Sequence, residues 1–284
     1  IDQMFDDADE AGKGVFVSQD TSFGKGTKEY ASMHSHEELA EHLMSLQGHQ
    51  QLSAFPMSAQ DKECCMYEVV REGWQCKLHL DIEWESEDMT ASDAHRVLAK
   101  VVSELSSFLQ VRYKIMPRLL VLVGSRAKGA KIKYSYHVVA CNVALASNFG
   151  GMKSTVHEFA SEHASDPLFF SNDKPIIDLL VYMKNRCFRT PLSHKKDDPT
   201  RTKLQRIAGR YWVPLPFTSA GELLDALVTY VPDNNDEIVI IPDPPVAPRT
   251  RFADTHISKK RRVVSSSLNA PFQGTCVPSA FDSS

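Results

Sequence analysis

The chain of 284 residues lacks several features that would place it in a specialised class. It has no continuous run of about 18 apolar residues, so we expect no segment to cross a membrane. None of its six cysteines forms a C-x-x-C pair, which argues against a zinc module and for reduced thiols in an intracellular protein. No internal repeat is visible. The chain begins at Ile1 without a signal-like segment, and we expect a trimmed or processed piece.

An excess of positive charge is also absent. The formal net charge is −4, so any contact with nucleic acid would need local basic patches. A hydrophobic content of 42% and a charged content of 24% are ordinary for a globular protein with a buried core. We expect a flexible acidic terminus over residues 1–12, a folded core over 13–240, and a largely disordered Pro-rich linker and tail over 241–284.

Hydrophobic periodicity predicts a mixture of strands and helices. Strands are predicted over residues 14–19, 66–70, 77–84, 118–124, 133–143 and 176–183. Helices are predicted over 91–110, over 152–164 and, after capping boxes that begin at Ser35 and Ser219, over Leu39–Leu46 and Leu223–Val231. We expect the strands at 66–70 and 77–84 to form a hairpin. Short connections between mixed elements indicate an α+β domain.

The segment KLHLDIEW carries the first pair of candidate site residues. Alternate side chains of a strand share a face, so Leu78, Leu80 and Ile82 are predicted to point to the core. Asp81 and Glu83 then point together to the opposite side, roughly 7 Å apart. A hard cation between two such carboxylates would offset their repulsion. A solvated strand face with two ordinary acids is the alternative.

The segment KYSYH carries a second set. The same alternation places Lys133, Ser135 and His137 on one face of a strand. A cation, a hydroxyl and an imidazole together suit phosphate oxygens. An ordinary surface or core pair is the alternative for the Ser and the His.

The segment IIDLLVYMKNRCFRTPLSHK carries the third set. Asp178 is predicted to lie inside an apolar strand, where an unpaired carboxylate is costly unless a metal ion or a donor meets it. Four basic residues follow within 17 positions, and arginines suit bidentate phosphate contacts. They are Lys184, Arg186, Arg189 and Lys195. A structural salt bridge to Asp178 is the alternative.

In this order, LHLDIEW, KYSYHVV and IDLLVYMKNRCFR…SHK resemble the motifs of the archaeo-eukaryotic primase superfamily, in its eukaryotic and viral primase-polymerase branch. The segment CMYEVVREGWQCKL falls where that family has a similar hairpin. The resemblance covers roughly residues 13 to 240. It implies an α+β primase catalytic fold, in which an N-terminal α/β module packs on an RRM-like module through mixed or antiparallel sheets with flanking helices.

The resemblance also implies an activity. Asp81, Glu83 and Asp178 would be the catalytic carboxylates that hold two Mg²⁺ or Mn²⁺ ions, with no zinc in this chain. The reaction would extend a primer on a DNA template with nucleoside triphosphates, in DNA replication or damage tolerance. De novo primer synthesis stays open, as do the sugar preference, lesion bypass and the preferred metal.

The same resemblance assigns the nucleotide-binding residues. Arg186 would act on the nucleotide or the template, and Lys28 falls near a basic position of the family. Cys187 departs from the polar residue usual there, so no sugar contact is carried over to it. The triphosphate itself would be bound by Lys133, Ser135, His137, Arg189 and Lys195.

Two further basic stretches have open interpretations. The first could follow a template backbone or stack a base, with burial favoured for its tryptophan; it comprises Arg201, Lys203, Arg206, Arg210, Tyr211 and Trp212. The second, Lys259–Arg262, is either a solvated charge cluster or a nuclear import signal, so a nuclear or an organellar location stays open. Prolines after residue 231 indicate a linker, in which IVII is compatible with an edge strand.

Three functions are therefore weighed. A primase-polymerase core is favoured, acting as a monomer whose tail is available to replication proteins. A metal-dependent nuclease would also use a D-x-E pair, a distant Asp and a Lys, but it would not need the K-x-S-x-H set. A non-catalytic module that binds single-stranded nucleic acid would keep the basic residues without needing the acidic triad.

Overall fold

The computed structural model describes residues 5–6, 14–20, 28–45, 65–196, 198–209, 212–232 and 237–244. Residues 1–245 form one compact unit, and residues 246–284 form a second unit, none of whose residues is among those described. The first unit is an α+β domain built on two main sheets, as the mixture of predicted elements indicated. Within the described ranges, no helix is long and apolar enough to cross a membrane.

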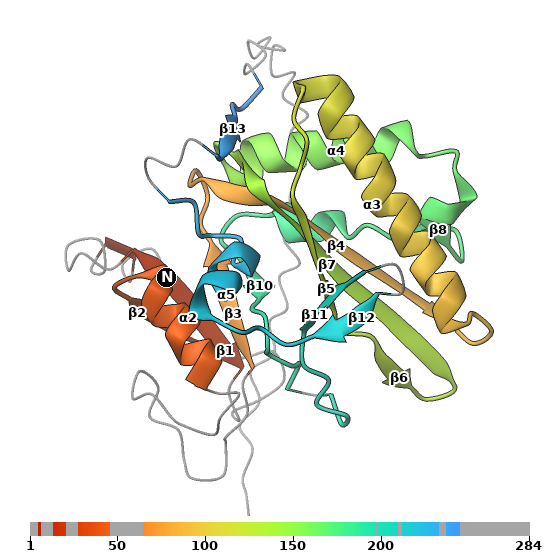
Figure 1. The fold of residues 1–284 in the computed structure, drawn as a ribbon, viewed down its shortest axis with the longest axis horizontal. Helices are drawn as coiled ribbons and strands as arrows, with labels where there is room; N and C mark the ends of the chain where they lie inside the picture. The colour runs from red at the N-terminus through yellow and green to blue at the C-terminus, as the bar shows by residue number, and fades with distance from the viewer. Residues whose placement is uncertain are drawn as a thin grey trace, which may run out of the picture. The chain divides into compact units, whose positions relative to one another are not determined.

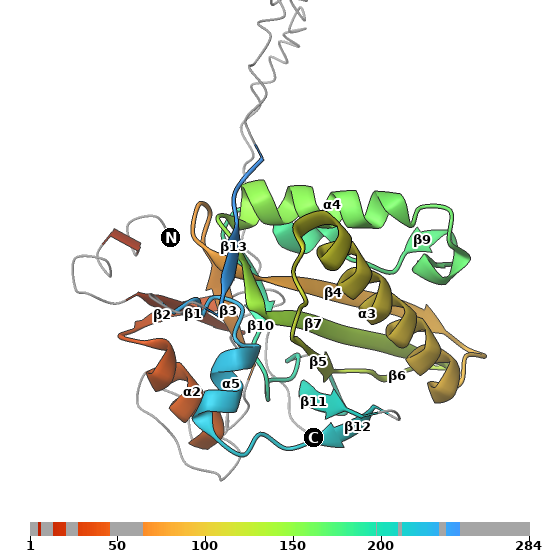
Figure 2. The same cartoon turned by 45° about the horizontal axis from the view of Figure 1, so that its top comes forward.

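The smaller sheet has four antiparallel strands in the order β10-β3-β1-β2 (Figure 1). Its strands are β1 (Val15–Asp20), β2 (Lys28–Met33), β3 (Met66–Val70) and β10 (Arg186–Arg189). Helix α2 (His36–Ser45) begins after Ser35, whose Oγ accepts the Glu38 amide 3.2 Å away, as the capping box predicted. Helix α5 (Ala220–Ala226) lies beside α2 (Figure 2), and both contribute to the apolar cluster of this sheet.

The larger sheet is centred on β7 (Lys131–Leu145), the longest strand. One edge of β7 pairs along its length with β4 (Cys76–Ser86). Its other edge pairs in turn with β6 (Arg126–Lys128), β5 (Leu119–Val123) and, in parallel, β13 (Val239–Ile241). Strands β11 (Gln205–Ala208) and β12 (Val213–Leu215) extend the sheet beyond β5.

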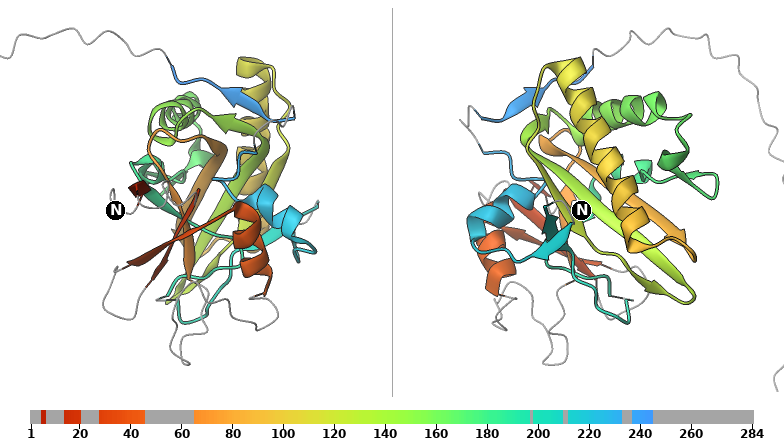
Figure 3. Two further views of the ribbon diagram at one scale, coloured as in Figure 1. Left: turned by 90° about the vertical axis from the view of Figure 1, so that its left-hand side faces the viewer. Right: turned by 45° about the vertical axis from the view of Figure 1, so that its right-hand side comes forward.

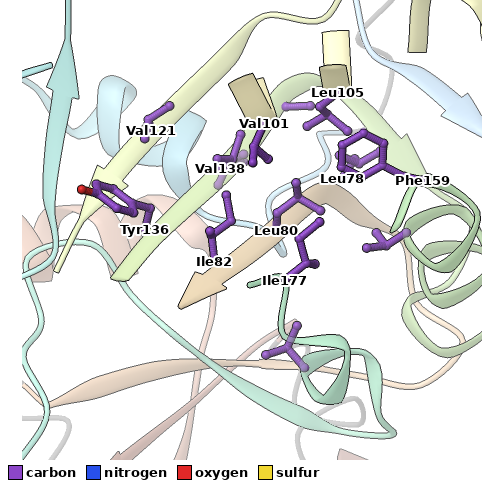
Figure 4. Close-up of a cluster of buried hydrophobic side chains, with 14 of the residues drawn as sticks. Leu78, Leu80, Ile82, Val101, Leu105, Val121, Tyr136, Val138, Phe159 and Ile177 are labelled. Atoms are coloured by element: carbon purple, nitrogen blue, oxygen red, sulfur yellow. The ribbon is translucent and has the colours of Figure 1, made fainter. Parts of the chain in front are cut away.

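Helix α3 (Ala91–Tyr113) covers one face of the larger sheet, across β4 and β7 (Figure 3). It begins with a capping box formed by Thr90 and Asp93. Helix α4 (Lys153–Glu162) follows a π-helical turn, η1 (Asn148–Met152). Side chains of β4, β5 and β7 pack against side chains of α3 and α4 in the main core (Figure 4), among them Leu78, Leu80, Ile82, Val101, Leu105, Val121, Val138 and Phe159.

The chain between α4 and β10 is mostly short turns. A 3-10 turn, η2 (Pro167–Phe169), precedes a small hairpin of β8 (Phe170–Ser171) and β9 (Lys174–Pro175). A second 3-10 helix, η3 (Leu179–Tyr182), follows. These turns bring the chain along the free edge of β4 and then into the smaller sheet.

The predicted hairpin between residues 66–70 and 77–84 is wrong, although both strands exist. β3 pairs with β1 and β10 in the smaller sheet, whereas β4 pairs with β7 in the larger one. The connection at residues 71–75 therefore passes from one sheet to the other. Local turn residues such as Gly73, with a φ of 77°, mark a reversal but do not determine which strands pair.

The predicted strand over 176–183 is also wrong. Only Ile177 makes a bridge, to Ile82 of β4, and the chain then turns into η3. Asp178 caps this turn, because its Oδ1 accepts the Leu180 amide at 2.8 Å. The carboxylate is thus half-buried at a helix start and is not enclosed in an apolar strand.

The helix predicted over Leu223–Val231 ends early, at Ala226. Leu227 is extended and the chain then bends at Val228 and Thr229, whose amides Glu68 accepts at 3.1 and 2.8 Å. The strand anticipated for IVII is confirmed as β13. Leu46, the end of the first predicted helix, lies outside the described residues.

Candidate functional site

Two of the candidate carboxylates come from β4 and the third from the chain beside its free edge. Asp81 and Glu83 lie half-buried on the face opposite Leu80 and Ile82, as the period of two predicted. The Asp178 amide donates to the Asp81 carbonyl at 2.8 Å, and this backbone contact places Asp178 next to Asp81. Residues almost 100 positions apart are thereby brought together.

Strand β7 supplies the neighbouring part of the same wall. In its antiparallel register with β4, Asp81 lies across from His137 and Glu83 lies across from Ser135. Lys133 of the same strand forms an ion pair with Glu83. The common face predicted for Lys133, Ser135 and His137 is therefore confirmed, and it adjoins the face of the two acids.

These residues line a cleft of about 590 Å³ between the two sheets. The larger sheet contributes acids and a histidine, while the smaller sheet contributes cations and aromatic rings. Its lining includes Lys28, Tyr67, Asp81, Glu83, His137, Asp178, Arg186, Arg189 and Lys195. Every predicted site residue except Lys133 and Ser135 lines this cleft directly, and these two contact Glu83.

Glu83 lies between two lysines. Its Oε1 is 3.4 Å from Lys195 Nζ, and its Oε2 pairs with Lys133 Nζ. Burial opposes ionisation of this carboxyl group, but the two ammonium groups outweigh it and hold the pKa of Glu83 below its usual range. Glu83 is thus a carboxylate at neutral pH.

Asp81 lies in a contrasting environment. Burial, followed by the charge of Glu83, raises the pKa of Asp81 to about 7. Its Oδ1 is buried without a hydrogen-bond partner among the described residues, and His137 Nε2 is 3.9 Å away. Burial also lowers the pKa of His137 well below its usual value, so this imidazole is neutral and does not offset the acid's charge.

Arg189 is the most deeply buried cation of the cleft, with 4% of its surface exposed. None of its three guanidinium nitrogens has a hydrogen-bond partner among the described residues. The guanidinium group packs against Gly124, where an added Cβ would be 2.6 Å from Nη2. Burial lowers the pKa of Arg189, although the acids of the cleft oppose that effect.

The carboxylates of the cleft offer the kind of ligand that a divalent cation needs. Carboxylate oxygens suit Mg²⁺ and Mn²⁺, and the unpartnered Oδ1 of Asp81 is available as a ligand. As they lie, no three such side chains within the described ranges are close enough to hold a metal ion, since Glu83 is turned to its lysines. The chemistry of the three carboxylates fits a hard cation.

The remaining predicted residues occupy the rim. Lys28 pairs with Asp20 at 2.6 Å, and its Nζ lies 3.2 Å from the centre of the Tyr67 ring. Arg186 is exposed at the mouth of the cleft. Cys187 is half-buried beside it and accepts a hydrogen bond from Ser18 Oγ at 3.2 Å, so its contacts are structural.

The described residues of the first further basic stretch do not line the cleft. Arg206 pairs with Glu222 at 3.1 Å, and Trp212 packs partly buried against the main core, which is the interpretation favoured for it. Arg210 and Tyr211 lie outside the described residues, as does the Lys259–Arg262 run.

Three aromatic residues of the site were not predicted. Tyr30 and Tyr67 line the cleft from the smaller sheet, and the Phe188 ring lies 4.2 Å from that of His137. The alternation in MYEVV, which turns Tyr67 away from the buried Met66 and Glu68, was a usable signal for one of them.

No family model matches this chain, and no curated protein matches it either. The fold and the chemistry of the cleft are therefore the observations on which a function is based.

Proposed function

We propose that this protein is a metal-dependent nucleotidyltransferase, the catalytic core of a DNA primase-polymerase that extends a primer on a template with nucleoside triphosphates. The two sheets with their helices would be the two modules of the archaeo-eukaryotic primase fold. The motif resemblance and the assembly of all three motifs around one cleft support this proposal.

The observation that carries it is a pair of unsatisfied charges of opposite sign in one cleft. In the described part of the chain, the guanidinium group of Arg189 is buried without a hydrogen-bond partner. Asp81 Oδ1 is also buried without a hydrogen-bond partner there. A buried charge without a partner costs several kcal/mol. A triphosphate that carries divalent cations would satisfy both, because its oxygens pair with the guanidinium group and its cations pair with the carboxylates.

The roles of the side chains follow from their positions. Arg189 and Lys195, which line the cleft, would hold the phosphate oxygens. Ser135, whose hydroxyl donates to Glu83 at 3.5 Å in this structure, would donate to a phosphate oxygen instead when the substrate binds. Neutral His137 would orient the phosphates by a hydrogen bond without adding charge. Asp81, Glu83 and Asp178 would bind two divalent ions, which when bound would help deprotonate the primer hydroxyl and neutralise the triphosphate.

The proposed reaction is attack of the primer 3′-hydroxyl on the α-phosphorus, which forms a phosphodiester bond and releases pyrophosphate. The cations of the chain would keep the leaving pyrophosphate aligned with the attacking oxygen. Most of the rate would then come from positioning and electrostatics. The number of cations, with Lys28, Arg189 and Lys195 in one cleft, favours a polyphosphate over the single phosphodiester of a nuclease substrate.

A labelled primer annealed to a longer template tests this proposal. With Mg²⁺ or Mn²⁺, products should lengthen only when nucleotides are present, and ribo- and deoxynucleotides supplied separately report the sugar preference. Primer-free reactions measure initiation separately. Shortened products without nucleotides would identify a nuclease, and strand binding without metal-dependent nucleotide binding would identify a non-catalytic module.

A further inference from the structure

A second hollow, of about 330 Å³, opens beside the main cleft and shares Glu83 with it. We call it the side pocket; its lining includes Glu83, Trp84, Glu85, Lys131, Lys133 and Lys174. It lies where the C-terminal end of β4 and the N-terminal end of β7 meet the β8–β9 hairpin.

Glu83 joins the two hollows. Its Oε1 faces Lys195, which lines the main cleft, and its Oε2 pairs with Lys133, which lines the side pocket. A substrate in either hollow therefore reaches the same carboxylate. Lys133 was predicted to bind the triphosphate, but its side chain lines the side pocket and not the main cleft.

The free charge of the side pocket is positive. Its two acids are already paired, Glu83 with two lysines and Glu85 with Lys128. Lys131 makes only a 3.4 Å contact with the exposed Glu87, and Lys174 has no ion pair among the described residues. Two lysines are thus available to an anion.

The β8–β9 turn fixes the position of Lys174. Asn172 and Asp173 have φ values of 50° and 59°, and two successive residues with positive φ form the tight hairpin turn that matches strand twist. Lys174 follows at once, in β9, and its side chain borders the side pocket. The backbone of Lys174 is thus fixed by a short hairpin, while its side chain is exposed at the pocket.

Phosphoryl transfer requires the attacking and leaving oxygens to be roughly in line across the phosphorus. The leaving pyrophosphate belongs with Arg189 and Lys195 in the main cleft, so the attacking strand must reach the carboxylates from the other side of Glu83. The side pocket opens there.

We propose that the side pocket binds the 3′-terminal phosphodiesters of the primer strand, with Lys131 and Lys174 contacting phosphate oxygens. This inference rests on the proposed function, because it assigns the second substrate of the same reaction. It separates two sets of cations: Arg189 and Lys195 serve the nucleotide, and Lys131 and Lys174 serve the strand.

The test uses the double variant Lys131→Ala, Lys174→Ala in the full chain. Both side chains are exposed, and the surface pair lost with Lys131 contributes little to stability, so the variant should fold. The matched control is Lys100→Ala, Arg112→Ala, which removes two cations from α3 on the far face of the sheet.

Fluorescence anisotropy of a labelled primer–template at several KCl concentrations gives strand affinity without catalysis. The pocket variant should bind about tenfold more weakly near 0.1 M salt, with a salt slope shallower by roughly 1 for each lysine lost. Its affinity for dATP with Mn²⁺ should equal that of the wild type. The control variant should match the wild type in both measurements.

Neutral methylphosphonate linkages show whether the side pocket contacts the primer strand or the template strand. Placed among the last three primer linkages, they should weaken binding to the wild type but not further weaken binding to the pocket variant. The inference would be overturned if the pocket variant bound the strand as tightly as the wild type, or if it lost as much affinity for dATP as for the strand. It would also be overturned if neutral linkages in the template, and not those in the primer, had effects that fail to add to those of the pocket variant. A wild type that neither extends primers nor binds dATP would refute the proposed function, while the strand affinities would still decide the role of the pocket.

Discussion

Buried charged side chains occur in two regions of this protein, and the two regions satisfy them differently. Between the sheets, Glu68 is 0% exposed and Lys77 is 1% exposed. Lys77 Nζ donates to the carbonyls of Leu224 and Asp225 at 2.7 and 3.1 Å. Glu68 accepts the amides of the segment that follows and the hydroxyl of Thr229. In the cleft, Arg189 is nearly as buried, but no described residue hydrogen-bonds to its guanidinium group.

The difference separates a structural role from a binding role. Glu68 of β3 and Lys77 of β4 hold one stretch of backbone, residues 224–229, between the two sheets, so the fold itself satisfies their charges. Arg189 and Asp81 line the walls of an open cleft, and in the part of the chain that the structure describes they lack such partners. A substrate is the missing partner that their positions allow.

Replacing Asp81 or Glu83 should have the largest effect on the rate of primer extension. Asp81→Asn or Glu83→Gln should lower the rate of primer extension by about 10³-fold or more, because each removes a charge that the reaction needs. The fold should persist, since removal of Asp81's charge relieves repulsion. Glu104→Gln, which removes an acid from α3 on the far face of the sheet, is the control. Extension at the normal rate by Asp81→Asn would remove Asp81 from the site.

The structural region should respond in stability and not in catalysis. Glu68→Leu should lower the free energy of unfolding by about 3–5 kcal/mol, because it leaves the Val228 amide, the Thr229 amide and the Thr229 hydroxyl without their acceptor. Urea denaturation measures this loss of stability. The control is Glu87→Leu, which replaces an exposed glutamate. A loss below about 1 kcal/mol would show that the charges of this region are not satisfied as the structure indicates.

The sequence predicted the local chemistry of the site well. The alternation in KLHLDIEW fixed the face of Asp81 and Glu83, and the alternation in KYSYH did the same for Ser135 and His137, because a period of two is a property of the strand alone. That these two strands pair, with Asp81 opposite His137, depends on register. A bulge between Lys77 and His79 shifts that register, and nothing in the alternation reveals it.

The wrong predictions share one physical cause. IIDLLVYM is apolar enough for a strand, but the Asp178 side chain accepts a nearby amide and starts a 3-10 turn. The last helix ends early because Glu68, over 150 positions away, accepts its next amides. The burial of Arg189 is likewise invisible in KNRCFR. In each case the outcome depends on contacts between distant segments.

Lys77 gives a smaller, pH-dependent effect. Burial lowers the pKa of Lys77 to about 8, from an ordinary value of 10.5. Between these values the unfolded chain binds more protons than the folded protein, so stability should rise with pH in this window. Urea midpoints of the wild type and of Lys77→Met, measured at pH 8 and pH 10, test this. The stability of the wild type relative to the variant should increase from pH 8 to pH 10. A flat or falling difference would show that Lys77 stays charged in the folded protein.

The most direct test of the central claim is the unfolding free energy of Arg189→Met, with and without nucleotide. Without nucleotide, the variant should be as stable as the wild type or about 1–2 kcal/mol more stable, because it removes a buried charge that lacks a partner. With dATP and Mn²⁺ at about 100 times Kd, the wild type should gain about 2.7 kcal/mol and the variant far less. A variant that is strongly destabilised without nucleotide, and that gains as much as the wild type with it, would contradict the claim that Arg189 is left unpaired for the substrate.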